Sequence, residues 1–212
     1  MKFKYEIEKY NFVREVSSLY DNCKLDEVHI KWTGNKQYDL LDNVVEDQST
    51  VYHKEFYSRI NTTNFYKIYD SFIKNVITEI IDEDFLYQRI PTFRVHQPDN
   101  IAVAKFHKDC DYNHSKDEIN FYLPLTKAWG TNTVWVESAP GKKDYSPIEA
   151  DVGECVMWKG ATLLHGNKVN DTCKSRVSVD FRVLPVSCYK DAEMYSITNQ
   201  TKMIVGQYWE RI

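Results

Sequence analysis

The hydrophobic pattern between residues 91 and 185 alternates with a period of two, and this feature most restricts the fold. A period of two is typical of a β-strand, whose successive side chains point to opposite faces of a sheet. Segment 118–126 alternates in this way, and 175–183 does so most clearly. In the latter segment, polar and apolar residues form two separate rows: Arg176, Ser178, Asp180 and Arg182 against Val177, Val179, Phe181 and Val183.

Shorter segments of the same kind occur at regular intervals and are separated by turn residues such as Pro140-Gly141, Gly153 and Gly160. We therefore predict an antiparallel sandwich or barrel. The expected strands are 93–96, 101–107, 118–126, 132–137, 154–158, 162–165 and 175–183.

Before this region, an apolar stripe with helical spacing predicts a helix over 66–82. The stripe consists of Tyr66, Tyr69, Ile73, Val76, Ile77 and Ile80. We expect one domain over 1–212, with a helical or mixed segment (1–90), a β-rich core (91–185) and a C-terminal extension (186–212).

Composition excludes several classes of protein. With 42% hydrophobic and 27% charged residues, the chain is too apolar for a disordered protein. A net charge of -4 argues against nucleic-acid binding driven by phosphate contacts. No apolar run is long enough to span a membrane, and the first residues do not resemble a signal peptide. Five cysteines without a Cys-x-x-Cys pair predict reduced thiols in a cytoplasmic protein.

His107 and Asp109 are separated by one residue at an expected strand end, so their side chains project to the same side. His165 follows an apolar run and precedes Gly166, which also places it at a strand end. Two histidines and one carboxylate on one face of a metal leave the opposite positions open, as in non-haem Fe(II) oxygenases. Asp111 is an alternative carboxylate ligand. A structural zinc site on His107, Cys110 and His114 is a second alternative, although no matching pair of ligands follows.

The polar row of 175–183 has two interpretations: an ordinary solvent-exposed strand face, or the wall of a polar pocket inside a barrel. A buried arginine would need an anionic partner, because an unpaired buried charge costs several kcal/mol (~3–5). Arg176 and Ser178 together offer a forked guanidinium and a hydroxyl to one carboxylate.

The motif His107-x-Asp109, then His165, ten residues, and Arg176-x-Ser178 resembles that of the Fe(II)/2-oxoglutarate-dependent dioxygenases. Residues 107–185 also resemble the streptomycin-biosynthesis oxygenase-like branch of that superfamily. The segments that carry this second resemblance are 118–126, 130–138, 165–167 and 175–182.

The resemblance implies a mainly β (α+β) fold, in which N-terminal helices precede a double-stranded β-helix of the jelly-roll, cupin-like type. It also implies that His107, Asp109 and His165 hold Fe(II), and that Arg176, assisted by Ser178, binds the distal carboxylate of 2-oxoglutarate. Asn120 and Asn132 are candidate hydrogen-bond donors to this co-substrate. We expect Arg94, Lys105, Tyr122 and Arg182 to contact the substrate.

The reaction implied is hydroxylation of a small polar molecule by O2, with release of succinate and CO2. Desaturation or ring closure in place of hydroxylation stays open. The substrate classes considered are an amino acid, an aminocyclitol and a sugar derivative. Two other functions stay open. A cupin-type metal enzyme that does not use 2-oxoglutarate would not need Arg176, and a non-catalytic jelly-roll binding module would leave the triad without metal. The sequence does not predict the oligomeric state.

Aromatic residues make up 14% of the chain, and many of them lie near the proposed ligands in sequence. We predict that they form part of the pocket wall as well as the core. The residues concerned are Phe106, Phe121, Tyr122, Trp129, Trp135, Trp158 and Phe181.

Overall fold

The computed structural model describes residues 1–32, 50–102, 105–191, 194–196 and 200–212. Within these ranges the chain forms two antiparallel sheets. The large sheet has the order β1-β7-β4-β9-β2-β10, and β3 also pairs with β9. Its strands are β1 Lys2–Lys4, β2 Phe85–Gln88, β3 Thr92–His96, β4 Ile119–Pro124, β7 Glu154–Trp158, β9 Arg176–Pro185 and β10 Trp209–Arg211.

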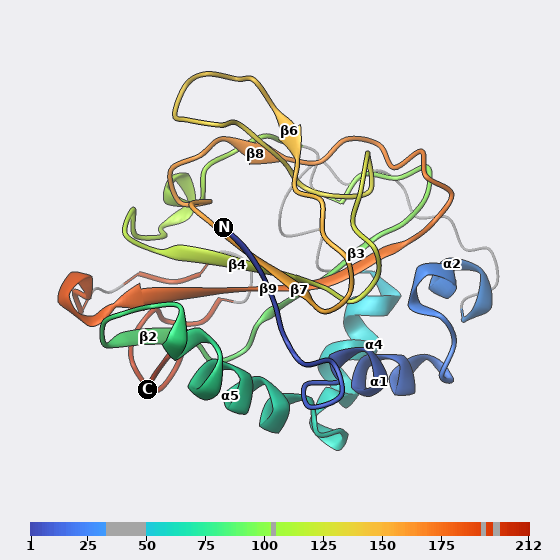
Figure 1. Ribbon diagram of the computed structural model, residues 1–212, viewed down its shortest axis with the longest axis horizontal. Helices are drawn as coiled ribbons and strands as arrows, with labels where there is room; N and C mark the ends of the chain where they lie inside the picture. Colours follow the sequence, from blue (N-terminus) through green and yellow to red (C-terminus); the bar gives the residue numbers. More distant parts are fainter. Residues whose placement is uncertain (33–49, 103–104, 192–193, 197–199) are drawn as a thin grey trace.

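The small sheet has the order β6-β5-β8. Its strands are β5 Trp135–Val136, β6 Ser146–Pro147 and β8 His165–Gly166. Figure 1 shows helices α1, α4 and α5 on one side of the large sheet, with β6 and β8 on the other side. The large sheet is therefore the middle layer, and its two faces meet different surroundings.

The described α-helices are short and lie in the first 75 residues: α1 Phe12–Ser17, α2 Val28–Lys31, α4 Val51–Arg59 and α5 Phe65–Asn75. Single 3₁₀ turns occur at η1 Ser18–Tyr20, η2 Leu25–Glu27, η3 Ile60–Thr62, η4 Ile77–Glu79, η5 Asp109–Tyr112 and η6 Val186–Cys188.

The helix predicted over 66–82 is α5, but it ends earlier, at Asn75, and a 3₁₀ turn follows over Ile77–Glu79. The run Val76-Ile77-Thr78 accounts for the difference, because three successive β-branched residues lose rotamer freedom in an α-helix. The predicted stripe still faces inward where Tyr69, Ile73 and Ile77 are buried.

Four of the predicted strands are present as β3, β4, β7 and β9, and β7 has the predicted bounds. Predicted strands 132–137 and 162–165 are reduced to the two-residue β5 and β8. In predicted strand 101–107, residues 103–104 lie outside the described part, and His107 makes only an isolated bridge. The strands β1, β2, β6 and β10 were not predicted, since two to four residues are too few to show a period.

The apolar rows of β4 and β9 face the helices. Phe121 and Phe181 stack with their ring centroids 5.0 Å apart, and Phe181 meets Tyr69 and Phe72 of α5 edge-on. Both phenylalanines are fully buried. This core holds one face of the sheet against the helices, so the polar rows of the same strands must point to the other side.

Replacing Phe181 by alanine is expected to lower the free energy of unfolding by about 3–5 kcal/mol, because a fully buried ring leaves a cavity in a packed core. Urea unfolding of the full chain measures this loss. Val169→Ala is the matched control, since Val169 is exposed and its truncation should change the free energy by less than about 0.5 kcal/mol. Equal effects of the two substitutions would contradict this assignment of the core.

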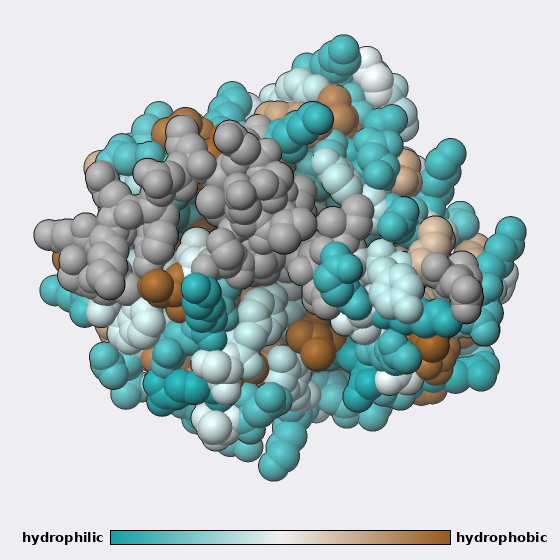
Figure 2. Space-filling view, turned by 180° about the vertical axis from the view of Figure 1, so that it is seen from behind, coloured by the Kyte–Doolittle hydropathy of each residue, from teal (hydrophilic) through white to brown (hydrophobic). Residues whose placement is uncertain are grey.

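Among the described residues, no helix has both the length and the apolar character needed to cross a membrane. Outside the grey atoms, the face shown in Figure 2 is mostly hydrophilic, with small scattered apolar patches. All five cysteines are unpaired.

Candidate metal centre

His107 and His165 lie side by side because their backbones pair. Each backbone N–H donates to the carbonyl of the other residue at 2.9 Å. The two imidazole rings have their centroids 4.5 Å apart. A pairing between residues 58 positions apart therefore brings both rings to one point at the edge of the small sheet.

Both imidazoles are held in the same tautomer. Nδ1 of His107 lies 3.0 Å from the carbonyl of Lys105, and Nδ1 of His165 lies 2.9 Å from the carbonyl of Leu163. A carbonyl only accepts hydrogen bonds, so each Nδ1 carries the hydrogen. The lone pair of each ring is then on Nε2, the atom that can bind a metal.

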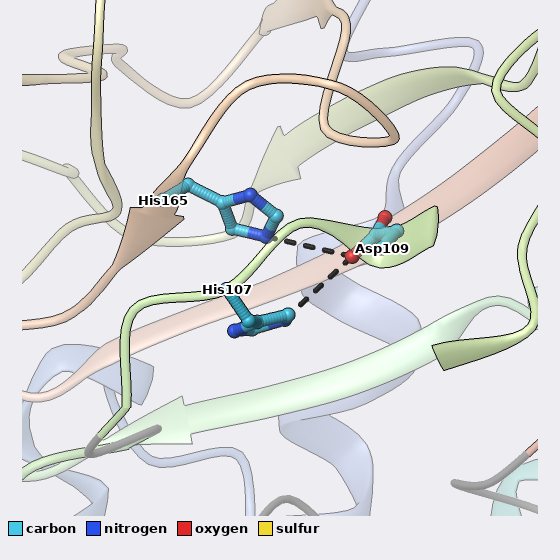
Figure 3. Close-up of side chains that lie close together, drawn as sticks. All are labelled: His107, Asp109 and His165. Atoms are coloured by element: carbon cyan, nitrogen blue, oxygen red, sulfur yellow. Dashed lines mark ion pairs between the residues drawn. The ribbon is translucent and has the colours of Figure 1, made fainter. Parts of the chain in front are cut away.

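Asp109 begins η5, and its backbone N–H donates to the carbonyl of Gly160 at 3.0 Å. Its Oδ1 lies 3.6 Å from Nε2 of His107 and 3.5 Å from Nε2 of His165. Dashed lines mark these two contacts in Figure 3. These separations are longer than a hydrogen bond, and they suit atoms that coordinate one ion at about 2.1 Å.

The Asp109 carboxylate is buried yet ionised. Burial would raise its pKa, but the guanidinium of Arg182 and the two histidines hold the pKa well below its ordinary value. The centre therefore offers one anionic carboxylate oxygen and two imidazole nitrogen atoms, the donor set of a 2-His-1-carboxylate iron site. In the described part of the chain, this is the one group of three such residues that converges.

Two buried polar atoms beside the triad have no hydrogen-bond partner: Oδ1 of Asn120 and Nε1 of Trp158. Both residues line the pocket that contains the triad. Buried polar groups normally have a hydrogen-bond partner, so we expect a bound molecule or water to contact these two atoms. The donor set and these orphaned atoms together fit a metal with further ligands.

A side chain at position 160 would close this space. A Cβ on Gly160 would lie 2.8 Å from the side chain of Asn120 and 2.9 Å from the ring of Trp158. Glycine is therefore required where the backbone that holds Asp109 passes the pocket wall.

Arg176 is almost fully buried, at 1% exposure, and lines the same pocket. Its Nε donates to the carbonyl of Asn132 at 3.0 Å, and its Nη1 donates to Oγ of Ser178 at 2.9 Å. Among the residues that the structure describes, no carboxylate lies within ion-pair distance of this guanidinium. The buried charge is thus oriented by neutral groups and lacks an anion.

The polar row of β9 is therefore not a solvent-exposed face. Arg176, Ser178 and Arg182 are buried, and Asp180 is partly buried. The interpretation of this row as a pocket wall is the one that burial supports.

The structure divides the other predicted site residues into two groups. Arg94, Asn120, Tyr122 and Arg182 line the pocket with the triad and Arg176. Ser178, Asn132 and Lys105 are not among the residues that line it.

Each of these three residues forms a hydrogen bond with another residue instead. Ser178 and the carbonyl of Asn132 orient Arg176, while Oδ1 of Asn132 accepts from the backbone N–H of Trp129 at 2.8 Å. Lys105 is exposed, and it contributes the carbonyl that holds His107.

Neither alternative ligand set comes together. Asp111 accepts from the backbone N–H of Lys108 at 3.3 Å and from the thiol of Cys110 at 4.0 Å, so it caps its own turn. The His114 side chain contacts Glu118 instead, with Nδ1 and Oε2 2.7 Å apart. The set His107, Cys110 and His114 does not converge on one point.

Sequence reasoning missed Asn167 and Gln88. Asn167 lines the pocket and donates to the carbonyl of Thr133 at 3.1 Å. Its position two residues after His165 was the available signal, because residues i and i+2 share a face. Gln88 contacts Arg182 from β2, and no signal in the sequence predicts this contact between distant strands.

The predicted aromatic wall is present only in part. Tyr122 and Trp158 line the pocket, and the Trp158 ring meets His165 edge-on with centroids 4.7 Å apart. Phe121 and Phe181 face the helices instead. Most of the aromatic content therefore belongs to the core between the sheet and the helices.

No family model matches the chain. A relative in sequence is the streptomycin biosynthesis protein StrG of Streptomyces griseus. It is 39% identical over 166 residues, which cover 78% of this chain and 78% of StrG.

Solved structures with the same fold share little sequence. The non-haem monooxygenase ThoJ, in its apo form, has a TM-score of 0.52 at 11% identity, over 91% of this chain and 75% of ThoJ. EctD from S. alaskensis with bound Fe has a TM-score of 0.50 at 11% identity, over 89% of this chain and 73% of EctD. These matches confirm the predicted cupin-like, mainly β fold with added helices.

Proposed function

The chain belongs to the family of the streptomycin biosynthesis protein StrG, and on that premise we propose that it is an Fe(II)/2-oxoglutarate-dependent oxygenase. Its reaction would be the hydroxylation of a small polar molecule by O2, with release of succinate and CO2. His107, Asp109 and His165 would hold the metal, which when bound supplies the oxygen-activating chemistry.

The observation that carries this proposal is the position of Arg176. Its buried guanidinium lies in the pocket that contains the triad, and no carboxylate in the described ranges is close enough to pair with it. The distal carboxylate of 2-oxoglutarate would supply the missing anion through charge-assisted hydrogen bonds. The opposite end of the same molecule would then be directed toward the metal.

The residues around Arg176 prepare it for this role. Ser178 and the Asn132 carbonyl fix the direction of the guanidinium, and its carbon atom lies 5.9 Å from the centroid of the Tyr122 ring. A side chain fixed in this way loses little entropy when the anion binds. Ser178 and Asn132 thus act on the co-substrate through Arg176.

Arg94 and Tyr122 are the predicted substrate contacts that this proposal retains. Nε of Arg94 pairs with Oδ1 of Asp180 at 3.1 Å, and both residues line the pocket. A paired cation and carboxylate at the wall suit a substrate with hydroxyl or charged groups, such as an amino acid, an aminocyclitol or a sugar derivative.

The cytoplasmic location of the protein stays a prediction.

Arg176 also discriminates between the functions that the sequence left open. A cupin-type metal enzyme without 2-oxoglutarate, or a binding module without metal, would have no use for this buried cation. A buried guanidinium that binds no anion would lower the stability of the folded protein. The oxygenase is therefore the function that the pocket supports best.

Anaerobic addition of Fe(II) and 2-oxoglutarate to the full chain tests the proposal. We expect a visible metal-to-ligand charge-transfer band, because the keto acid would chelate an iron held by the triad. Fe(II) without 2-oxoglutarate is the control and should give no such band. Correctly folded wild-type protein that gives no band with both components would contradict the proposed function.

A further inference from the structure

The two oxygen atoms of Asp109 have different surroundings. Oδ1 faces the two histidines, whereas Oδ2 receives three N–H donors: Nη2 of Arg182 at 2.8 Å, Nε of Arg182 at 3.1 Å and Nδ2 of Asn120 at 2.7 Å. Three donors saturate Oδ2. Only Oδ1 is left to bind a metal.

Strand register brings these donors together. Asn120 of β4 and Arg182 of β9 are direct partners in the antiparallel pair, so their side chains lie next to each other on one face. That face is opposite to the one packed on the helices. The pairing of two central strands thus places a carboxamide and a guanidinium against the same carboxylate oxygen.

The Arg182 guanidinium also has polar neighbours other than Asp109. Its Nη1 lies 3.4 Å from Oε1 of Gln88 and 3.8 Å from Oδ2 of Asp180, and its Nε lies 3.7 Å from Oε2 of Glu118. Glu118 is buried and in turn bonded to His114 at 2.7 Å. Each nitrogen of the guanidinium therefore has a polar neighbour within the protein.

We propose that Arg182, together with Asn120, is a positioning residue that makes Asp109 a one-oxygen ligand of the metal. This inference rests on the proposed function. With Oδ2 occupied, the carboxylate takes one coordination position. The positions that a keto acid and O2 require are then left open. From the sequence, Arg182 is expected to contact the substrate; the role proposed here is to hold Asp109.

Arg182→Met in the full chain is the first test. It removes both N–H donors and the charge while keeping a long side chain. We expect Fe(II) affinity, measured anaerobically without 2-oxoglutarate, to fall about 10- to 100-fold, as is typical when a residue supporting a metal ligand is removed. We also expect the charge-transfer band of the complex with 2-oxoglutarate to shift in wavelength, because Asp109 could then bind through both oxygens.

Two further variants keep the test decisive. Arg182→Lys retains the charge but loses the two-point contact, so its affinity and band should fall between wild type and Arg182→Met. Arg182→Lys tests the proposed role if the methionine variant does not fold. Arg89→Met removes an exposed arginine that pairs with Glu210 at 3.3 Å, and it should leave both readouts unchanged.

The outcomes separate this inference from the proposed function. No band in folded wild type would overturn the oxygenase proposal. The role of Arg182 alone would be overturned if wild type gives the band and folded Arg182→Met has the same Fe(II) affinity and band position as wild type. If the methionine variant does not fold, the same result in Arg182→Lys would overturn it. Reduced affinity with a shifted band would support it, because a merely structural defect would leave the band of the bound fraction in place.

Discussion

Asp109→Ala is expected to abolish metal binding and to destabilise the protein at the same time. The substitution removes the one anionic donor of the triad, so the loss of Fe(II) affinity should exceed the about 10- to 100-fold typical of supporting residues. It also leaves the buried Arg182 without its closest counter-charge, at 2.8 Å. Breaking a buried ion pair in this way costs about 3–5 kcal/mol in the free energy of unfolding.

The destabilisation should lie toward the lower end of that range. Glu118 and Asp180 remain 3.7 and 3.8 Å from the guanidinium and offset part of the lost attraction. Anaerobic Fe(II) titration and urea unfolding measure the two effects separately.

Asp111→Ala is the matched control for both measurements. Asp111 accepts a backbone hydrogen bond in its own turn and does not face the histidines. We expect this variant to keep wild-type Fe(II) affinity. Loss of iron in Asp111→Ala, with iron retained in Asp109→Ala, would show that the other aspartate is the ligand.

Arg176→Ala is expected to remove most of the affinity for 2-oxoglutarate while Fe(II) affinity stays close to wild type. Truncating one partner of a buried, hydrogen-bonded charge pair costs about 2–5 kcal/mol, or roughly 30- to 5,000-fold in Kd. The metal should be retained because, among the residues that the structure describes, Arg176 forms no hydrogen bond or ion pair with the triad; its guanidinium donates to Asn132 and Ser178.

Titration of the charge-transfer band with 2-oxoglutarate measures this loss. Arg176→Lys should be intermediate, since the ammonium keeps the charge but lacks the planar fork that Asn132 and Ser178 orient. Wild-type affinity for 2-oxoglutarate in a folded Arg176→Ala variant would contradict the assignment of the co-substrate site.

Local patterns predicted the elements that depend on neighbours in sequence. The alternation over 175–183 identified the two faces of β9, and the polar face is buried as the pocket interpretation required. The spacing of His107 and Asp109 placed both side chains on one side, and with His165 they lie close enough to hold one ion.

The placement of the aromatic residues could be predicted only in part. Composition did not reveal that Phe181 packs against α5 with Phe121 stacked on it, while Tyr122 and Trp158 line the pocket. Within β4, however, Phe121 and Tyr122 differ by one position, and strand geometry sends their side chains to opposite faces. The sidedness was therefore available from the sequence, but the identity of the layer on each face was not.

By itself, the sequence determined which side chains share a strand face, because that property depends only on the period of an extended backbone. The tertiary structure alone decided what each of those side chains meets. Arg182 illustrates the difference. Its place on the polar face followed from alternation, but its contact with Asp109 depends on the register Asn120↔Arg182 between strands about 60 residues apart. Register between distant strands is set by the packing of the whole sheet, so a positioning residue of the metal centre could be predicted only as a polar residue of the pocket.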